Sequence, residues 1–183
     1  MDVGDGPAAV IFTDIVDFTR YNAERGDDAA VELLEEQSRL VRELLPPCAR
    51  VVKELGDGLM LWVADASAAI ETCLSIQARV TDQQQGDDPV FVRIGAHWGS
   101  PRRRGDDFIG MVVNLAARIV DLAGAGEVLV SEALLDAAGD LSSLHARAHE
   151  LGPVFVKGVP DPVALYRVEA VLRTEPLADA PSR

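Results

Sequence analysis

Two apolar runs on either side of a Gly-Asp-Gly turn constrain the fold of this chain more than any other stretch. The runs flank Gly56, Asp57 and Gly58. Apolar runs separated by so short a turn predict two antiparallel strands joined by a hairpin, here over residues 49–63. The hairpin would present the carboxylate of Asp57 at its tip, four residues after Lys53. Because Asp and Gly favour turns for conformational reasons alone, the hairpin by itself does not establish a function.

A second carboxylate stands at the end of another apolar run. Residues 8–14 read as a buried strand that ends in Asp14. Two carboxylates at strand ends suit a hard cation such as Mg²⁺, which takes one or two protein carboxylates and leaves its other positions to water and phosphates. Asp14 and Asp57 together therefore suggest a nucleotide-dependent reaction.

The size and charge of the chain restrict the class of protein. The 183 residues suggest one domain, and an apolar content of 48% is enough for a real core. The formal net charge of −13 argues against nucleic-acid or anionic-membrane binding, which needs a basic surface. A nucleotide ligand remains compatible, because a few local cations and metal ions can hold phosphates in an acidic protein.

The ends of the chain and its cysteines carry no targeting or metal signal. The sequence has no secretory signal at its start and no apolar run of about 18 residues, so we expect a cytoplasmic chain without a membrane segment. Cys48 and Cys73 lack metal-ligand spacing and read as reduced thiols. We expect a flexible lead-in over 1–7, a domain over 8–170 and a disordered tail over 171–183.

The order of the expected elements predicts the fold class. Helices on either side of the hairpin, and a strand after the second helix, predict an α+β protein with a ferredoxin-like βααββαβ sheet and helices on one face. The sequence has neither the G-x-G-x-x-G of a Rossmann fold nor a P-loop motif. The remaining expected elements are helices at 28–45, 65–82, 110–123 and 131–138, the last with Ser131 as N-cap, strands at 90–98 and 127–130, a loop at 99–107, and two or three closing strands near 144–150, 153–157 and 163–170.

Pattern alone leaves the role of two groups of polar residues open and favours a core or strand role for a third. Asn114 and Arg118 are one turn apart on a predicted helix, so they form either an ordinary wet face or a pair that binds phosphate and hydroxyl oxygens. The arginines at 102–104 either clamp phosphates or are simply solvated. The third group reads as core or strand residues and comprises His97, Trp62 and Trp98.

Five short motifs together resemble the catalytic domain of class III nucleotide cyclases. Their order and spacing agree with that family over residues 8–170, and the compact loops are most similar to bacterial, especially actinobacterial, members. The motifs are Phe-Thr-Asp-Ile at 12–15, Lys-Glu-Leu-Gly-Asp-Gly at 53–58, Gly-Asp-Asp-Phe-Ile-Gly at 105–110, Val-Asn-Leu-Ala-Ala-Arg at 113–118 and Val-Lys-Gly at 156–158.

The resemblance implies a role for each matching residue. Asp14 and Asp57 match the metal-binding aspartates of the family, and the backbone at Ile15 would assist them. Lys53 and Asp107 match the pair that reads adenine. The remaining matches are Asn114 and Arg118, the transition-state pair, with Arg118 also at the phosphates, and Lys157, which contacts the terminal phosphates.

The same resemblance implies the reaction and the assembly. An adenylate cyclase would convert ATP to 3′,5′-cyclic AMP and pyrophosphate with two Mg²⁺ or Mn²⁺ ions, at sites shared within a head-to-tail homodimer. Alternatives are a guanylate cyclase and a catalytically silent module that dimerises or senses nucleotide. A diguanylate cyclase would need a Gly-Gly-Asp/Glu-Glu-Phe run, which is missing here.

The chain departs from the family pattern at two positions. Asp17 stands where the family often has glycine, in the turn that would approach the phosphates. Asp106 directly precedes Asp107 and competes with it for the base-reading role. We prefer Asp107 because it stands three residues before Gly110, as in the family pattern.

Overall fold

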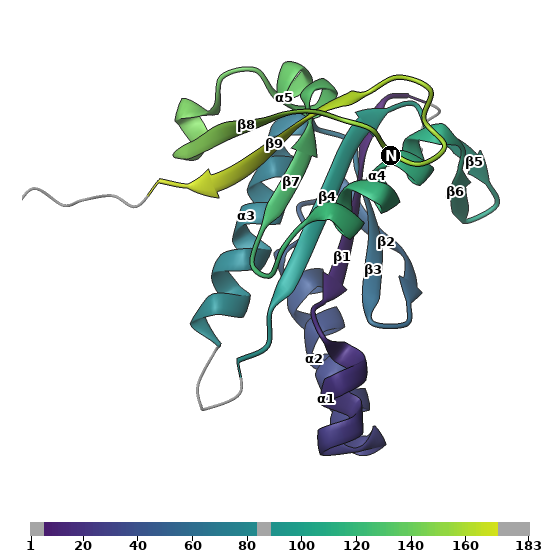
Figure 1. The fold of residues 1–183 in the computed structure, drawn as a ribbon, viewed down its shortest axis with the longest axis vertical. Helices are drawn as coiled ribbons and strands as arrows, with labels where there is room; N and C mark the ends of the chain where they lie inside the picture. The colour runs from purple at the N-terminus through teal and green to yellow at the C-terminus, as the bar shows by residue number, and fades with distance from the viewer. Residues whose placement is uncertain (1–5, 84–88, 172–183) are drawn as a thin grey trace, which may run out of the picture.

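The computed structural model describes residues 6–83 and 89–171 (Figure 1). The expected lead-in over 1–7 and the tail over 171–183 lie almost entirely outside these residues. The elements, in chain order, are β1 (Ala8–Ile15), α1 (Phe18–Arg25), α2 (Asp27–Leu44), β2 (Ala49–Leu55), β3 (Gly58–Val63), α3 (Ala66–Asp82), β4 (Val92–Gly99), β5 (Arg102–Arg104), β6 (Asp107–Ile109), α4 (Met111–Leu122), β7 (Val128–Ser131), α5 (Glu132–Ala138), a 3₁₀ turn (Leu141–Leu144), β8 (Ala146–Val154) and β9 (Val163–Ala170).

Within the described residues, seven strands form one mixed sheet in the order β2-β3-β1-β4-β7-β9-β8. Strands β4 and β7 run parallel, and the other neighbouring pairs are antiparallel. The first seven elements follow the predicted βααββαβ order, and the 49–63 hairpin forms as β2 and β3. The α+β fold predicted from the sequence is therefore confirmed.

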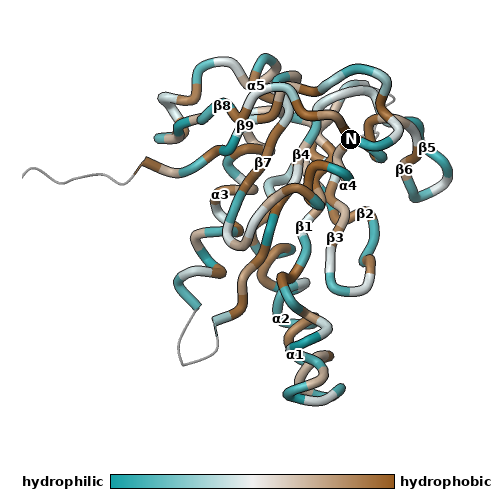
Figure 2. Tube along the Cα trace, in the orientation of Figure 1, coloured by the Kyte–Doolittle hydropathy of each residue, from teal (hydrophilic) through white to brown (hydrophobic). Residues whose placement is uncertain are grey.

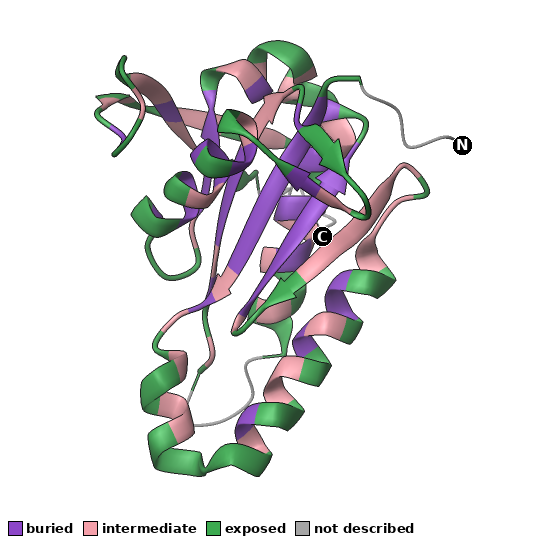
Figure 3. Ribbon diagram, turned by 90° about the vertical axis from the view of Figure 1, so that its right-hand side faces the viewer, coloured by how far each residue is buried: buried purple, intermediate pink, exposed green. Residues whose placement is uncertain are grey.

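The expectation that the helices cover one face of the sheet is wrong. Alternate side chains of β1 enter two separate clusters, because successive residues of a strand point to opposite faces. Ala9 and Ile11 pack in the cluster that contains residues of α2 and α3. Val10 and Phe12 pack with residues of α4 on the other face. The central strands are therefore buried on both sides, as Figure 3 shows.

Helix α4 approaches the sheet unusually closely, and its mostly hydrophobic residues are visible in Figure 2. A Cβ atom built on Gly95 of β4 would overlap the backbone of Val120 and would lie 2.8 Å from the carbonyl carbon of Ile119. Only glycine leaves room for a helix backbone at this distance. Gly95 therefore fixes the height of α4, and with it Asn114 and Arg118, above the sheet.

Four local details go beyond the expected residue ranges. The first helix of the βααββαβ order, for which no residue range was expected, is α1 at residues 18–25. The expected loop at 99–107 instead contains strand β5 and leads into β6, and the two strands form a hairpin that turns at Gly105 with φ 64°. The strands expected near 144–150 and 153–157 form one strand, β8, with an irregularity before Gly152. Ser131 precedes α5, but its side chain makes no capping hydrogen bond.

Candidate active site

The carboxylates of Asp14 and Asp57 meet at one end of the sheet. Asp14 lies near the end of β1, opposite Gly58 of β3. Gly58 in turn directly follows Asp57 in the hairpin turn. The backbone N–H of Ile15 donates to the carbonyl of Asp57 at 3.2 Å. A Cβ atom on Gly58 would collide with the carbonyl oxygen of Thr13, so this glycine allows the hairpin to lie against β1. The predicted Asp14–Asp57 neighbourhood is therefore present in a single chain.

Both aspartates line a pocket of about 630 Å³. Ile15, Asp17 and Arg93 also line it. Asp17 adopts the left-handed conformation with φ 58° and ψ 26° at the start of α1. This backbone conformation explains why glycine would suit the position, and Asp is among the side chains that tolerate it best.

Arg93 contacts the Asp14 carboxylate, although no sequence pattern indicated it as a site residue. Its Nε and Nη2 atoms both lie 2.6 Å from Oδ2 of Asp14. Burial raises the pKa of Asp14 above its ordinary value, with a further upward contribution from the Asp57 carboxylate, while the Arg93 hydrogen bond opposes the rise. The only sequence signal was a charged residue in a strand pattern, which is ordinary for a strand with one solvated face.

The donor set at this pocket fits a divalent cation held by two carboxylates. Among the described residues, no group of three or more His, Cys, Asp or Glu side chains is arranged to hold a metal ion. Mg²⁺ and Mn²⁺ sites that serve nucleotides commonly take only one or two carboxylates and complete their shell with water and phosphate oxygens. The raised pKa of Asp14 beside Asp57 also reflects two like charges that a cation would relieve.

Lys53 and Asp107 form the second feature of the site. Lys53 Nζ on β2 lies 2.7 Å from Oδ2 of Asp107 on β6, although the residues are 54 apart in sequence. The other carboxylate oxygen of Asp107 accepts the N–H of Phe108 at 2.7 Å. The hydrogen bond from Lys53 holds the pKa of Asp107 below its ordinary value. It is thus Asp107, the residue preferred over Asp106, whose carboxylate contacts Lys53.

The other predicted site residues lie apart from the Asp14–Asp57 pocket. Asn114 and Arg118 are exposed on α4, and Arg118 Nη1 lies 3.4 Å from Oδ2 of Asp121. Lys157 is exposed between β8 and β9. None of the described residues that line the pocket is Lys53, Asp107, Asn114, Arg118 or Lys157. One chain therefore groups the acidic residues and the Lys53–Asp107 pair separately, and leaves Asn114, Arg118 and Lys157 facing solvent.

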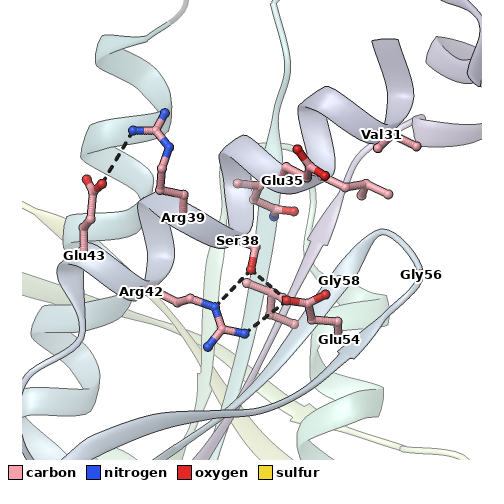
Figure 4. Close-up of a pocket in the computed structure, with 12 residues that line it drawn as sticks. Val31, Glu35, Ser38, Arg39, Arg42, Glu43, Glu54, Gly56 and Gly58 are labelled. Carbon is pink, nitrogen blue, oxygen red and sulfur yellow. Dashed lines mark hydrogen bonds and ion pairs between the residues drawn. The ribbon is translucent and has the colours of Figure 1, made fainter. Parts of the chain in front are cut away.

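Another pocket, of about 570 Å³, lies between α2 and the β2–β3 hairpin (Figure 4). Two ion pairs line it. Glu54 accepts hydrogen bonds from Ser38 at 2.8 Å and from Arg42 at 3.1 Å, and Arg39 pairs with Glu43 at 3.5 Å. With Glu35 also in the lining, the pocket has three carboxylates against two guanidinium groups, so it offers no excess positive charge for a phosphate ligand.

The arginines at 102–104 are exposed on β5. They line a hollow of about 610 Å³ with Ser100, Pro101 and Ile109. None of the aspartates of the Asp14–Asp57 pocket, called the acidic pocket below, lines this hollow. The phosphate role considered for these arginines therefore has no support from the geometry of the acidic pocket.

His97 has a partner that the sequence did not reveal. Its Nδ1 atom lies 2.7 Å from Oγ of Ser131, so the serine hydroxyl is directed at His97, and it makes no capping hydrogen bond to α5. Burial lowers the pKa of His97 below its ordinary value. The pair joins β4 to the end of β7, and Ser131 is 1% exposed, so we assign it a structural role.

Comparison with known proteins identifies the family. The chain belongs to the adenylate and guanylate cyclase catalytic domain family, whose model matches residues 4–170. It is 28% identical over 166 residues to a pH-sensitive adenylate cyclase of Mycobacterium tuberculosis, a match that covers 90% of this chain and 41% of the relative. It is 32% identical over 125 residues to an adenylate cyclase of Streptomyces griseus, covering 68% of this chain and 31% of the relative. The chain thus spans less than half the length of these curated relatives.

Solved structures share the same fold. An adenylate cyclase of Trypanosoma brucei in its monomeric state superposes with a TM-score of 0.79 at 24% identity, covering 89% of each chain. The adenylyl cyclase CyaB of P. aeruginosa gives 0.77 at 23% identity, covering 91% of this chain and 95% of the other. The guanylyl cyclase Cya2 gives 0.74 at 23% identity, covering 96% and 98%. No helix in the described part of the chain has the length and apolar character of a transmembrane span.

Proposed function

We propose that this chain is an adenylate cyclase that converts ATP to 3′,5′-cyclic AMP and pyrophosphate. The observation that carries the proposal is the 2.7 Å pair between Lys53 and Asp107, which gives one donor and one acceptor side by side. Adenine presents an amino donor and ring-nitrogen acceptors, so Asp107 accepts from the amino group while Lys53 donates to a ring nitrogen. Guanine would set its carbonyl against the Asp107 carboxylate and leave buried polar groups unpaired.

The acidic pocket would serve the triphosphate end of the substrate. Asp14 and Asp57 are the residues that would hold divalent cations, with help from the backbone at Ile15. Bound there, Mg²⁺ or Mn²⁺ would lower the pKa of the ribose 3′-hydroxyl and neutralise the leaving pyrophosphate. Arg93 lies on the same carboxylate, so it supplies a positive charge at the pocket when no cation is present.

The residues on α4 would stabilise the reacting centre. The reaction is an in-line attack of the 3′-hydroxyl on the α-phosphorus, which depends mainly on positioning and charge stabilisation. Arg118 presents a fixed fork of N–H donors that suits the charge developing on the α-phosphate. Asn114, one turn away, orients the ribose. Lys157 provides a further positive charge for the terminal phosphates.

Because the two groups of residues lie apart in one chain, we propose that a complete site forms between two copies. One copy supplies Asp14 and Asp57. The other supplies the remaining five residues, which are Lys53, Asp107, Asn114, Arg118 and Lys157. All seven occur in this sequence, so a head-to-tail homodimer with two equivalent sites suffices.

The direct test is to measure cyclic nucleotide from ATP and from GTP, with Mg²⁺ or Mn²⁺, as a function of protein concentration. We expect cyclic AMP as the main product, and a rate per chain that rises with concentration until dimers saturate. Preferential cyclic GMP would instead make the chain a guanylate cyclase. Turnover of neither nucleotide by folded, dimeric protein would favour the catalytically silent module.

A mixing experiment tests the shared site. Asp14→Ala and Asn114→Ala chains should each be inactive alone, since each homodimer has two damaged sites. Mixed together, they should recover activity through one intact site per heterodimer. Verified heterodimers without activity would refute the shared site. Arg118→Ala should lower kcat much more than it raises KM, and equal effects on both would contradict its assigned role.

A further inference from the structure

The position of Asp107 depends on side chains rather than on the main sheet. Asp107 belongs to β6, which pairs with β5 in a separate two-stranded sheet. Lys53 belongs to β2, at the edge of the seven-stranded sheet. No backbone ladder joins β6 to β2 among the described strands, so other contacts must set the distance between the two charged groups.

A bulge in β2 brings two basic residues to the same face. Arg50 pairs with Trp62, and Lys53 pairs with Met60, with a register shift between Val51 and Lys53. Residues three apart on a regular strand point to opposite faces, and one extra residue in the strand removes this difference. Arg50 and Lys53 therefore both point to the face of the sheet on which Trp62, Met60 and the β6 residue Phe108 are buried.

Arg50 contacts both neighbours of Asp107. Its guanidinium carbon lies 5.2 Å from the centroid of the Phe108 ring, within the range of a cation–π interaction. Its Nη2 atom donates to the carbonyl of Asp106 at 3.5 Å. Phe108 is 1% exposed and stacks on Trp62, with ring centroids 6.0 Å apart and planes at 9°. Arg50 thus contacts the residues that directly precede and directly follow Asp107 in the chain.

The same cluster carries a cost to stability. Arg50 Nε and Trp62 Nε1 are buried and have no hydrogen-bond partner among the described residues. Buried donors without partners lose the hydration that they have in the unfolded chain. An apolar side chain in place of Arg50 would remove its buried Nε donor from this cluster. The presence of arginine at this position therefore points to a role other than stability.

We propose that Arg50 is a positioning residue that sets the nucleobase selectivity of the site, by fixing Asp107 against Lys53 through Phe108 and the Asp106 carbonyl. This inference rests on the proposed function, because it assigns base reading to Lys53 and Asp107. Arg50 itself does not touch the base. Its removal leaves both reading groups in the chain but lets their separation vary.

The test compares Arg50→Met with a matched control, Arg39→Met. Methionine keeps an apolar stem over the Phe108 ring and loses the charge and the N–H donors, whereas Arg39 lies on α2 and pairs with Glu43. For Arg50→Met we expect KM for ATP to rise about tenfold, the effect of losing one well-placed hydrogen bond, with little change in kcat. The preference for ATP over GTP should fall by a similar factor, and the control should behave as wild type.

A second readout does not depend on turnover. The pKa of Asp107, followed by carboxyl ¹³C NMR, should rise toward its ordinary value in Arg50→Met, because the hydrogen bond from Lys53 is the largest of the contributions that lower it. Arg50→Lys keeps the charge without the planar fork and should restore the low pKa only in part. If Arg50→Met does not fold, Arg50→Lys decides the question by the same two measurements.

The outcomes separate this inference from the proposed function. Unchanged ATP selectivity, or an unchanged pKa of Asp107, in folded Arg50→Met would overturn the positioning role even if the wild type makes cyclic AMP. If the wild type makes no cyclic nucleotide, the proposed function fails and the pKa measurement alone decides whether Arg50 positions Asp107. A variant that only loses thermal stability, with both readouts unchanged, also counts against the inference.

Discussion

Replacing Gly95 by alanine tests the close approach of α4 to the sheet at β4. The added Cβ would lie 2.5 Å from the Cα atom of Val120 and 2.8 Å from the carbonyl carbon of Ile119. Carbon atoms in van der Waals contact need about 3.5 Å, so α4 would have to move away by about 1 Å. The atoms that are hit belong to the backbone of a helix, which cannot turn aside as a flexible side chain can.

The expected cost of Gly95→Ala follows from this displacement. Inserting a group into a well-packed core costs about 1–3 kcal/mol, and a clash with backbone belongs at the upper end. For a domain of this size, a loss of about 3 kcal/mol lowers Tm by about 6–12 °C. Asn114 and Arg118 move with α4, so catalysis should fall as well, at temperatures where the variant remains folded.

Urea unfolding followed by circular dichroism measures the free energy, and calorimetry measures Tm. Gly6→Ala is the matched control, because nothing lies within 4 Å of the added Cβ at that exposed position. The control should change stability by less than about 0.5 kcal/mol. If Gly95→Ala unfolds within that same margin of the wild type, α4 does not lie where the structure has it, and the reasoning from close approach is wrong.

Three further predictions concern the acidic pocket and the thiols. The raised pKa of Asp14 means that the folded state binds a proton more readily than the unfolded chain, so ionisation of this group costs stability above its folded pKa. Asp14→Asn should therefore unfold at a higher urea concentration than the wild type at pH 7. The difference in unfolding free energy should vanish below the ordinary pKa of Asp14. A variant that is less stable than the wild type at pH 7 would contradict the predicted direction of the change. Mn²⁺ at about 100 times its dissociation constant should stabilise the folded chain by about 2.7 kcal/mol, and the effect should disappear in Asp57→Asn; an equal rise of Tm in that variant would place the metal elsewhere. Burial raises the pKa of the Cys73 thiol to about 12, so brief labelling at pH 8 should modify the half-buried Cys48 and spare Cys73, and mass spectrometry that finds equal labelling would refute this burial.

The sequence was informative wherever a pattern repeats locally. The hairpin over 49–63 and the helix over 65–82 were predicted within a few residues, because period-2 and period-3.6 patterns are local properties. The pairing of Lys53 with Asp107 was implied by the family resemblance, and the 2.7 Å contact agrees with it. Their roles, like those of Asn114 and Arg118, remain predictions that the experiments above test.

The features that the sequence did not predict depend on distant segments. The burial of α4 on the second face is marked only by Gly95, and a glycine in a strand has several meanings. The bulge between Val51 and Lys53 is defined by the partner strand, so no local pattern reports it. Arg93 reaches Asp14 from 79 residues away and alternates in its strand like any solvated side chain.

The 2.7 Å contact between Lys53 and Asp107 has a consequence for ligand exchange. Any ring that enters between the two side chains must first separate a charge-assisted hydrogen bond. A ring that matches both side chains forms two hydrogen bonds in place of the one that was separated. A ring that matches only one side chain leaves the other charge without a partner, and the Lys53–Asp107 pair then re-forms and displaces the ring. If Lys53 and Asp107 read the base as proposed, the base must compete with re-formation of the hydrogen bond between them. A stronger pair would then make the site more selective and would also slow nucleotide binding.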